Sequence, residues 1–249
     1  MISKIALITG ASSGIGWATA KKVASLGIGL IVCGRRKERL EALKKELDVP
    51  VHSLTFDVCD KQAVFDAIES VPEPFRQIDI LINNAGNAHG LAPVHTADLK
   101  DWDAMIDSNV KGLMYVTKAV LPQMTTRKKG HIINVGSIAG REVYPNGSVY
   151  CSSKFAVDAF TQGLRLDLNS IGIKVSAIHP GLVETEFSKV RFKGDAERAN
   201  KVYEGVDPLT PADVADAIGY MVLAPAHVNI ADLVLLPTRQ ANAYVLNRK

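Results

Sequence analysis

The sequence predicts a single, doubly wound α/β domain, and three observations lead to that prediction. The chain has 249 residues, of which 47% are hydrophobic, a size and composition that suit one α/β domain with a large core. Apolar, β-branched runs alternate along the chain with segments of helical periodicity. The apolar runs are apolar throughout, which indicates strands buried on both faces of a parallel sheet. We therefore expect a Rossmann fold with seven parallel strands, in the order 3-2-1-4-5-6-7, and helices on both faces.

The expected strands can be placed in chain order. They are residues 5–9, 29–34, 51–57, 78–83, 131–137, 174–179 and 232–237. Helical spacing of apolar residues fills the segments between them, for example GWATAKKVASLG and RKERLEALKKEL.

No repeat or linker interrupts this rhythm, so residues 1–249 are expected to form one domain. Residues 186–210 are the exception, because they are polar, charged and longer than an ordinary strand-to-helix connection. We expect this segment to be a lid over the substrate.

Composition excludes several classes of function. Net charge is +3, and Lys and Arg are spread along the chain, so the sequence does not show the clustered basic residues that are typical of nucleic-acid binding. The three cysteines, Cys33, Cys59 and Cys151, are odd in number and form no C-x-x-C, which argues against a disulfide framework or a metal site. No apolar run approaches the ~20 residues of a membrane span, and the N-terminus leads directly into a strand without a signal peptide. We expect a soluble, cytoplasmic protein in a reducing compartment.

A glycine-rich turn, ITGASSGIG, follows the first strand. Gly10, Gly14 and Gly16 let the backbone approach a pyrophosphate at a helix N-terminus, and Ser12 and Ser13 can add hydroxyl donors. Glycines can also serve close helix packing alone, but their position after the first buried strand favours a dinucleotide site. The expected phosphate-binding set is Gly10, Ser12, Ser13, Gly14, Ile15 and Gly16.

The end of the second strand indicates which dinucleotide binds. A site for NAD places a carboxylate about 20 residues after the glycines, to bond the ribose 2′-hydroxyl. This chain has Arg35 and Arg36 there instead. Two solvated arginines opening a helix are the alternative, but a cationic pair with forked donors suits the 2′-phosphate of NADP. We expect NADP as the cofactor.

Further cofactor contacts are expected at the ends of the third and fourth strands. Asp57 can bond the adenine amino group and Val58 can pack on its ring. In NNAG, Asn84 can cap the backbone, while Ala85 and Gly86 leave room for the cofactor. Each is common turn chemistry, but all lie at carboxyl ends of parallel strands, where ligands bind in such sheets.

The segment YCSSK raises the question of how a Tyr can serve as a base, since its pKa in water is near ~10. Tyr150 and Lys154 are four residues apart and face the same side of a helix. The charges of Lys154 and of an oxidised nicotinamide are expected to lower the pKa of Tyr150. Tyr150 can then exchange a proton with a substrate oxygen that Ser137 also bonds. A surface Tyr–Lys pair is the alternative, since this spacing is frequent by chance.

These motifs resemble the short-chain dehydrogenase/reductase family over nearly the whole chain. The matches are TGASSGIG (9–16), NNAG (83–86), Ser137, YCSSK (150–154) and HPGLVET (179–185). The resemblance implies Tyr150 as general acid and base, Ser137 as stabiliser of the substrate oxygen, and Lys154 as ribose ligand and tuner of Tyr150. It also implies that Asn109 holds a water in a proton relay and that the protein is a homotetramer. Residues implied to line the nicotinamide are Pro180, Gly181, Val183 and Thr185.

Loop segments such as GSIAGREVYPNGSVYCSSKFAV and GLVETEFSKVRFKGD resemble the NADP-dependent 3-hydroxy acid (serine) dehydrogenase branch of the family. That resemblance implies oxidation of L-serine, L-allo-threonine or another small 3-hydroxy acid, or reduction of the matching semialdehyde. A broad carbonyl or 3-oxoacyl reductase is the first alternative. A non-catalytic NADP sensor is the second, and the intact set Ser137, Tyr150 and Lys154 argues against it.

A hydroxy acid substrate needs a cation, because burying an unpaired carboxylate costs several kcal/mol. Two arginines are candidates for this anchor. Arg141 lies four residues after Ser137, and Arg191 lies in the expected lid. Phe187 and Phe192 in the same lid are expected to exclude water when it closes.

Overall fold

The chain folds around one parallel sheet, and the computed structural model describes residues 4–249. The strands are β1 (Ile5–Thr9), β2 (Gly29–Gly34), β3 (Val51–Thr55), β4 (Ile80–Asn83), β5 (Gly130–Val135), β6 (Ile173–Pro180) and β7 (Asp232–Leu235). They lie in the order β3-β2-β1-β4-β5-β6-β7, with every neighbouring pair parallel. The predicted fold class and strand order are confirmed.

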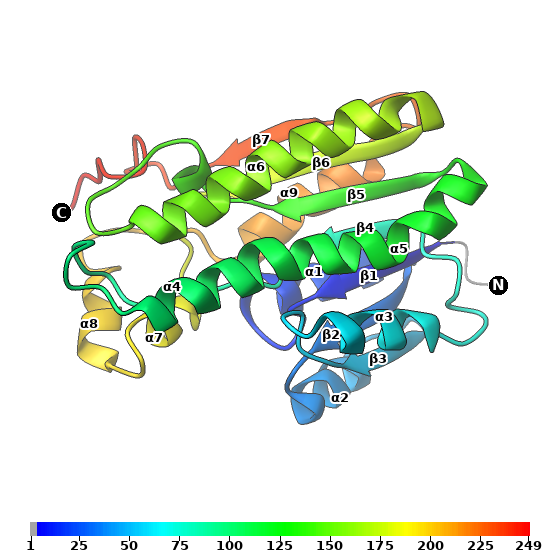
Figure 1. Ribbon diagram of the computed structural model, residues 1–249, viewed down its shortest axis with the longest axis horizontal. Helices are drawn as coiled ribbons and strands as arrows, with labels where there is room; N and C mark the ends of the chain where they lie inside the picture. The colour runs from blue at the N-terminus through cyan, green and yellow to red at the C-terminus, as the bar shows by residue number, and fades with distance from the viewer. Residues whose placement is uncertain (1–3) are drawn as a thin grey trace.

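Helices cover both faces of the sheet. The α-helices are α1 (Gly14–Ser25), α2 (Lys37–Lys45), α3 (Lys61–Glu69), α4 (Leu99–Ile106), α5 (Leu113–Arg127), α6 (Ser148–Leu168), α7 (Phe187–Arg191), α8 (Ala196–Lys201) and α9 (Pro211–Leu223). A π-helical turn η1 (Asp107–Gly112) joins α4 to α5, and short 3₁₀ turns form η2 (Ile138–Gly140) and η3 (Asn169–Ile171). Helices α5 and α6 lie in front of the sheet and α1 and α9 behind it (Figure 1).

Residues that alternate along a strand pack into two separate hydrophobic cores, one on each face of the sheet. In β1, Ala6 and Ile8 join the core that packs on α1 and α9, while Ile5 and Leu7 join the core beneath α5 and α6. Both sets are almost fully buried, with exposed fractions of 3% or less. Burial on both faces explains why the strands are apolar throughout instead of alternating with polar residues.

The strand order reverses beside β1, which pairs with β2 on one side and β4 on the other. This reversal opens a crevice at the carboxyl ends of the strands, where doubly wound sheets bind ligands. Strands β3 and β5 end two residues earlier than predicted, at Thr55 and Val135. Asp57 and Ser137 therefore lie on the loops beyond the strands, facing that crevice.

The segment expected to be a lid is more regular than its sequence suggests. Residues 186–210 contain α7 and α8, which lie together at the carboxyl end of the sheet (yellow in Figure 1). Thr210 and Asp213 then form a capping box that starts α9. Whether the segment moves as a lid stays a prediction.

Within residues 4–249, no helix combines the length and the apolar character needed to cross a membrane.

A chain of buried hydrogen bonds lies toward the amino-terminal ends of the strands, away from the crevice. His131 on β5 is 5% exposed, and its Nε2 lies 2.8 Å from the Ser176 hydroxyl on β6. That hydroxyl donates to Asn229 Oδ1 at 3.0 Å. Burial lowers the pKa of His131 from 6.5 to about 3, with smaller contributions from the charges of Lys174 and Lys4.

This histidine should make the protein sensitive to acid. The unfolded chain binds a proton at His131 below about pH 6.5, whereas the folded protein does so only near pH 3. The contribution of His131 to the free energy of unfolding is therefore fully present above pH 6.5 and is lost as the pH falls from 6.5 towards 3. The slope from this one group approaches ~1.4 kcal/mol per pH unit. Chemical denaturation of wild type and His131→Gln from pH 7 to pH 4 should show a shallower loss in the variant. Parallel slopes for the two proteins would contradict this assignment.

Candidate active site

The turn after β1 is built around close backbone contact with the end of β4. Gly10 has a φ of +67°, and a Cβ there would lie 2.8 Å from Asn84 Nδ2 and 2.9 Å from the Cα of Ala85. A Cβ on Gly16 would lie 2.3 Å from the carbonyl oxygen of Gly10. Asn84 Nδ2 donates to the carbonyls of Thr9 (2.9 Å) and Gly10 (3.3 Å). The glycines are therefore required by contact with β4, and Asn84 braces the turn.

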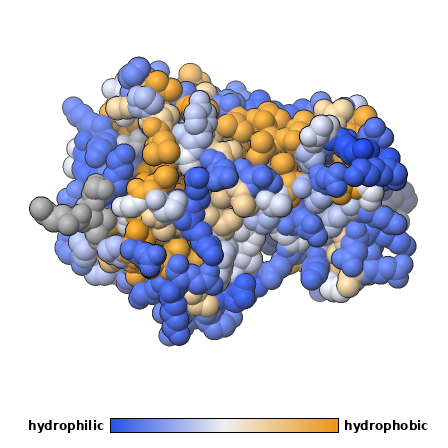
Figure 2. Space-filling view, turned by 180° about the vertical axis from the view of Figure 1, so that it is seen from behind, coloured by the Kyte–Doolittle hydropathy of each residue, from blue (hydrophilic) through white to orange (hydrophobic). Residues whose placement is uncertain are grey.

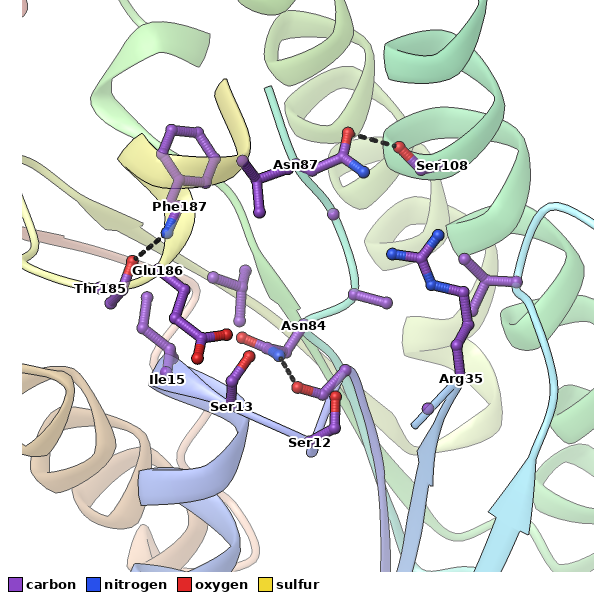
Figure 3. A pocket seen from close by; sticks show the side chains of 18 of the residues that line it. Ser12, Ser13, Ile15, Arg35, Asn84, Asn87, Ser108, Thr185, Glu186 and Phe187 are labelled. Atoms are coloured by element: carbon purple, nitrogen blue, oxygen red, sulfur yellow. Dashed lines mark hydrogen bonds between the residues drawn. The ribbon is translucent and has the colours of Figure 1, made fainter. Parts of the chain in front are cut away.

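A pocket of about 620 Å³ runs along the carboxyl ends of the strands, from Arg35 to Phe187 (Figure 3). Nineteen of the predicted site residues line it. They are Gly10, Ser12, Ser13, Gly14, Ile15, Arg35, Arg36, Asp57, Val58, Asn84, Ala85, Gly86, Ser137, Tyr150, Lys154, Pro180, Gly181, Val183 and Thr185. Four others, Gly16, Asn109, Arg141 and Arg191, lie outside its lining. The structure thus brings together motifs that are spread along the sequence from Gly10 to Thr185.

The two arginines after β2 differ in their surroundings. Arg36 lies over the glycine turn: its Nη2 donates to Ser13 Oγ at 2.6 Å and to Ser12 Oγ at 3.3 Å. Its Nη1 forms an ion pair with Glu186 Oε2 at 3.1 Å. Arg35 instead contacts the loop after β3, where its Nη1 is 3.6 Å from Asp57 Oδ2. Both guanidinium groups are partly exposed, so both are accessible to an anion entering the pocket.

Tyr150, Ser137 and Lys154 meet at the other end of the pocket. Tyr150 is 8% exposed, and its side chain lines the pocket together with Ser137. Lys154 is equally buried and its Nζ donates to the carbonyl of Val135 at 3.0 Å. Burial lowers the pKa of Lys154 from 10.5 to about 8, so it remains mainly protonated at neutral pH.

The chain's own groups do not lower the Tyr150 pKa, so the predicted lowering, which also invoked the charge of an oxidised nicotinamide, stays a prediction. Burial raises this pKa above its ordinary value of 10, and the nearby Tyr144 adds to the rise. The Ser137 hydroxyl and the charge of Arg191 act in the opposite direction but do not outweigh burial. Spacing alone identified the Tyr–Lys pair, but it could not give the cost of burying a phenolate.

Asn109 belongs to the π-turn η1, and its side chain is occupied by protein partners. Its Oδ1 accepts from the backbone N–H of Asn87 at 2.8 Å. Its Nδ2 donates to the carbonyl of Asn87 (2.8 Å) and to Ser153 Oγ (3.0 Å). The amide thus connects the segment after β4 to helix α6, one turn from Tyr150. The water-holding role implied by the family resemblance stays a prediction.

Arg141 is not placed to anchor a substrate, which corrects one of the sequence-based candidates. Its Nη2 lies 2.6 Å from Asp232 Oδ1, 3.2 Å from Asp158 Oδ1 and 2.9 Å from His179 Nε2. The ligand atoms of Asp158, His179 and Asp232 lie within 4.8 Å of one another, and the guanidinium is the cation among them. Arg141 therefore ties the Ser137 loop to α6, β6 and β7, on the side away from the pocket.

Arg191 does reach the reacting end. It closes helix α7, and its guanidinium carbon lies 5.6 Å from the ring centroids of both Tyr144 and Tyr150. Its Nε donates to the carbonyl of Gly90 (3.1 Å) and its Nη2 to the hydroxyl of Tyr144 (3.0 Å). A recess of about 30 Å³ lies between Arg191, Tyr150 and His89.

The two lid phenylalanines have different positions. Phe187 lines the pocket and packs edge-on against Tyr150, with ring centroids 5.7 Å apart. Phe192 is buried under the guanidinium of Arg198, 4.5 Å from its ring, and does not belong to the pocket lining. In this arrangement Phe187 faces the pocket and Phe192 does not; the predicted role of Phe192 on lid closure stays a prediction.

Sequence reasoning missed several residues that shape the site. Tyr144 positions Arg191, Glu186 pairs with Arg36, and Asn87 binds Asn109 and lines the pocket. Tyr144 is the aromatic residue in the loop between Ser137 and Tyr150, and its presence there was the only available signal in the sequence.

The residues present fit a dinucleotide with an extra phosphate. The turn between β1 and α1 has no space for side chains, and hydroxyls and N–H groups surround it. Two guanidinium groups lie where a 2′-phosphate would bind; the acids nearby are Asp57, held by the backbone N–H of Cys59 at 3.0 Å, and Glu186, paired with Arg36 at 3.1 Å. The donor set thus favours NADP over NAD.

Comparison with known proteins agrees with this site. A family model described as short chain dehydrogenase matches residues 4–196. An NADP-dependent 3-hydroxy acid dehydrogenase from Salmonella typhi is 47% identical over 240 residues, covering 96% of this chain and 97% of that protein. Sulfoacetaldehyde reductase 2 from Chromohalobacter salexigens is 46% identical over 251 residues, covering 99% and 100%. The closed form of a serine dehydrogenase complexed with NADP+ superposes with a TM-score of 0.94 at 44% identity, covering 98% and 99%.

The position of Arg141 generates a stability prediction. Arg141→Met should lower the free energy of unfolding by about 2 kcal/mol, because the buried Asp158 carboxylate loses its cation, whereas Asp232 is partly exposed and keeps Arg165 at 3.3 Å. Arg76→Met is the control, since Arg76 makes an exposed pair with Glu73 at 3.9 Å and a long hydrogen bond to the Val71 carbonyl at 3.5 Å, and its loss should have little effect. Urea denaturation measures both. Similar losses in the two variants would show that the Arg141 cluster does not stabilise the fold.

Proposed function

The chain belongs to the short-chain dehydrogenase family, and we propose that it transfers a hydride between NADP and the hydroxyl of a small 3-hydroxy acid. The substrates envisaged are L-serine, L-allo-threonine and 3-hydroxypropionate, or malonic semialdehyde in the reductive direction. The observation that carries this proposal is Arg191, whose guanidinium lies beside Tyr150 in the substrate recess. The chain is an NADP-dependent dehydrogenase acting on CH–OH groups. The identity of the acid is the proposed part.

Arg191 has donors left for a carboxylate. A guanidinium carries five N–H groups. Gly90 and Tyr144 accept two of them, and within residues 4–249 the Nη1 group and the second Nη2 proton have no protein acceptor. The Nη1 and Nη2 groups together form one forked edge, which can bind two carboxylate oxygens at once. The contacts to Gly90 and Tyr144 hold the fork in place, which lowers the entropy lost on binding.

The proton chemistry belongs to Tyr150 and its neighbours. NADP, when bound, accepts or supplies the hydride. Tyr150 takes the proton from the substrate hydroxyl, and Ser137 donates a hydrogen bond to the oxygen as charge develops on it. In this proposal the charge of Lys154, which stays mainly protonated, favours the phenolate form once an oxidised nicotinamide adds its own positive charge.

The alternatives differ in what they require at the recess. A broad carbonyl or 3-oxoacyl reductase needs no charge-specific contact, and an NADP sensor needs no turnover. A sulfonate offers an oxygen anion in the same place as a carboxylate, and one relative at 46% identity is a sulfoacetaldehyde reductase. A substrate panel should therefore contain carboxylate, sulfonate and neutral alcohols.

We also propose that the enzyme works as a cytoplasmic homotetramer in which residues 186–210 act as a lid. Apolar side chains gather in patches on the face opposite to that of Figure 1 (Figure 2). Leu223 on α9 is 63% exposed and Val234 on β7, at the edge of the sheet, is 53% exposed. Leu166 on α6 is 76% exposed. Exposed apolar groups on several faces favour contacts between subunits, and native mass spectrometry would measure the assembly.

Removing the Tyr150 hydroxyl tests the acid–base assignment. Tyr150→Phe keeps the ring that packs on Phe187 but removes the proton carrier. Turnover should fall by at least ~10²-fold while NADP+ binding is retained, because a positioned acid–base group contributes about 10²–10⁴ in rate. Steady-state kinetics and fluorescence titration with NADP+ measure the two effects. Near-normal turnover would assign proton transfer to another residue.

Arg191→Met tests the proposed substrate class. Catalytic efficiency (kcat/KM) should fall by roughly ten- to a hundredfold with 3-hydroxypropionate, because a charge-assisted fork is lost. The loss should be small with 3-hydroxypropionamide, which has the same size but no charge. Isethionate, the sulfonate, distinguishes which anion the wild-type recess prefers.

Lys189→Met is the matched control, since it removes an exposed cation from the same helix. It should affect neither substrate. Equal losses with the charged and neutral substrates in Arg191→Met would argue against the anchor and support a broad carbonyl reductase. A wild-type protein that binds NADP+ but oxidises none of these alcohols would support the sensor.

A further inference from the structure

Glu186 places a carboxylate at the phosphate-binding end of the pocket. It precedes α7 directly and points toward Ser13 on the glycine turn (Figure 3). Its Oε2 accepts a hydrogen bond from Arg36 Nη1 at 3.1 Å, and Arg36 Nη2 in turn donates to Ser13 Oγ at 2.6 Å. Thr185, the preceding residue, lies across the same turn, 3.4 Å from the position of a Cβ on Gly14. One acidic side chain thus contacts both the turn and the guanidinium above it.

These partners are the groups that the cofactor itself needs. The hydroxyls and N–H groups at the start of α1 suit a pyrophosphate, and Arg36 suits a 2′-phosphate. A carboxylate and a phosphate compete for the same donors, and they repel each other when both are close to the turn.

Glu186 is ionised in this position. Burial works against the charged form, but the hydrogen bond from Arg36, the charge of Arg36 and the nearby Ser13 hydroxyl outweigh it, so the pKa of Glu186 lies below its usual value. At neutral pH the group is therefore a full negative charge next to Arg36 and Ser13.

On the basis of the proposed function, we propose that Glu186 is an internal competitor for the phosphate groups of NADP. Cofactor binding exchanges the Arg36–Glu186 ion pair for contacts between Arg36 and phosphate. Glu186 sets the cofactor affinity in this way, below the value that the donor set alone would give.

The exchange is feasible because the ion pair is weak. The side chains of Arg36 and Glu186 are 42% and 50% exposed, and pairs this open to water contribute little. A phosphate dianion makes the stronger partner for a guanidinium. The carboxylate therefore lowers affinity without blocking the site.

The exchange also links the two ends of the pocket. Glu186 accepts a backbone hydrogen bond from Val190 at 3.0 Å, in the first turn of α7. The same short helix carries Phe187, which packs on Tyr150, and Arg191, the proposed anchor. The effect of cofactor phosphates binding at Arg36 is thereby transmitted through α7 to the substrate recess.

Isothermal titration of NADP+ into wild type and Glu186→Gln tests the proposal. The amide keeps the size and hydrogen-bonding capacity but removes the charge. The dissociation constant should fall by roughly fivefold, the range expected for an exposed ion pair. Glu184→Gln is the matched control: Glu184 is exposed on the same segment and, unlike Glu186, is not among the described residues that line the pocket. Its dissociation constant should stay within about twofold of wild type.

A double-mutant cycle with Arg36→Ala separates competition from general electrostatics. Without Arg36, Glu186→Gln should tighten NADP+ binding much less, because the contested partner is gone. Amide hydrogen exchange across residues 187–191 should change on NADP+ addition in wild type, and less in Glu186→Gln.

The outcomes separate this inference from the function on which it rests. Unchanged or weaker binding by Glu186→Gln, equal tightening with and without Arg36, or an NADP+ response of α7 that is the same in both proteins would overturn the inference. If wild type and Glu184→Gln both bind NADP+, the proposed function survives that result. Failure of wild type to bind NADP+ would overturn the proposed function itself.

Discussion

The contact between the turn after β1 and the end of β4 is the constraint on which the rest of the site depends. Gly10 and Asn84 approach so closely that a single methyl group would separate them. Asn84 then bonds the carbonyls of Thr9 and Gly10, which fixes the direction of the turn and the start of α1. Everything that faces the pocket from β2, β3 and β5 is placed relative to this junction, because the strands on both sides are paired to β1 and β4.

Electrostatics divides the pocket into two unlike ends. At one end Arg35 and Arg36 are open to solvent, with carboxylate partners that an anion can replace. At the other, Tyr150 and Lys154 are buried, and burial moves both pKa values toward the neutral form of each side chain. Binding thus relies on accessible charge, whereas catalysis relies on groups whose charged forms are costly without a partner.

The fold and most of the cofactor site could be predicted from the sequence, because both depend on local patterns. Strands that are apolar on both faces, a glycine turn and strand-end residues such as Asp57 can each be recognised within one short segment of the sequence. Arg141 and Arg191 were not distinguishable in this way. Arg141 meets Asp158 and Asp232, which lie 17 and 91 residues further along the chain, and no local pattern announces those partners. The Tyr150 pKa is likewise raised by burial and by Tyr144, and Phe187 packs on Tyr150 from α7, a distant part of the chain.

The strand order also has a consequence for how the protein acquires its binding site. Asn84 and Thr9 are 75 residues apart in sequence, so the phosphate turn cannot be completed until two intervening strands and three helices have been made. Bringing such distant segments together carries a loop-closure cost before any contact repays it, which slows folding. A nucleotide that binds only the finished turn stabilises the native state by mass action. During synthesis, the cofactor can therefore hold the chain in its native form only after β4 has taken its place beside β1.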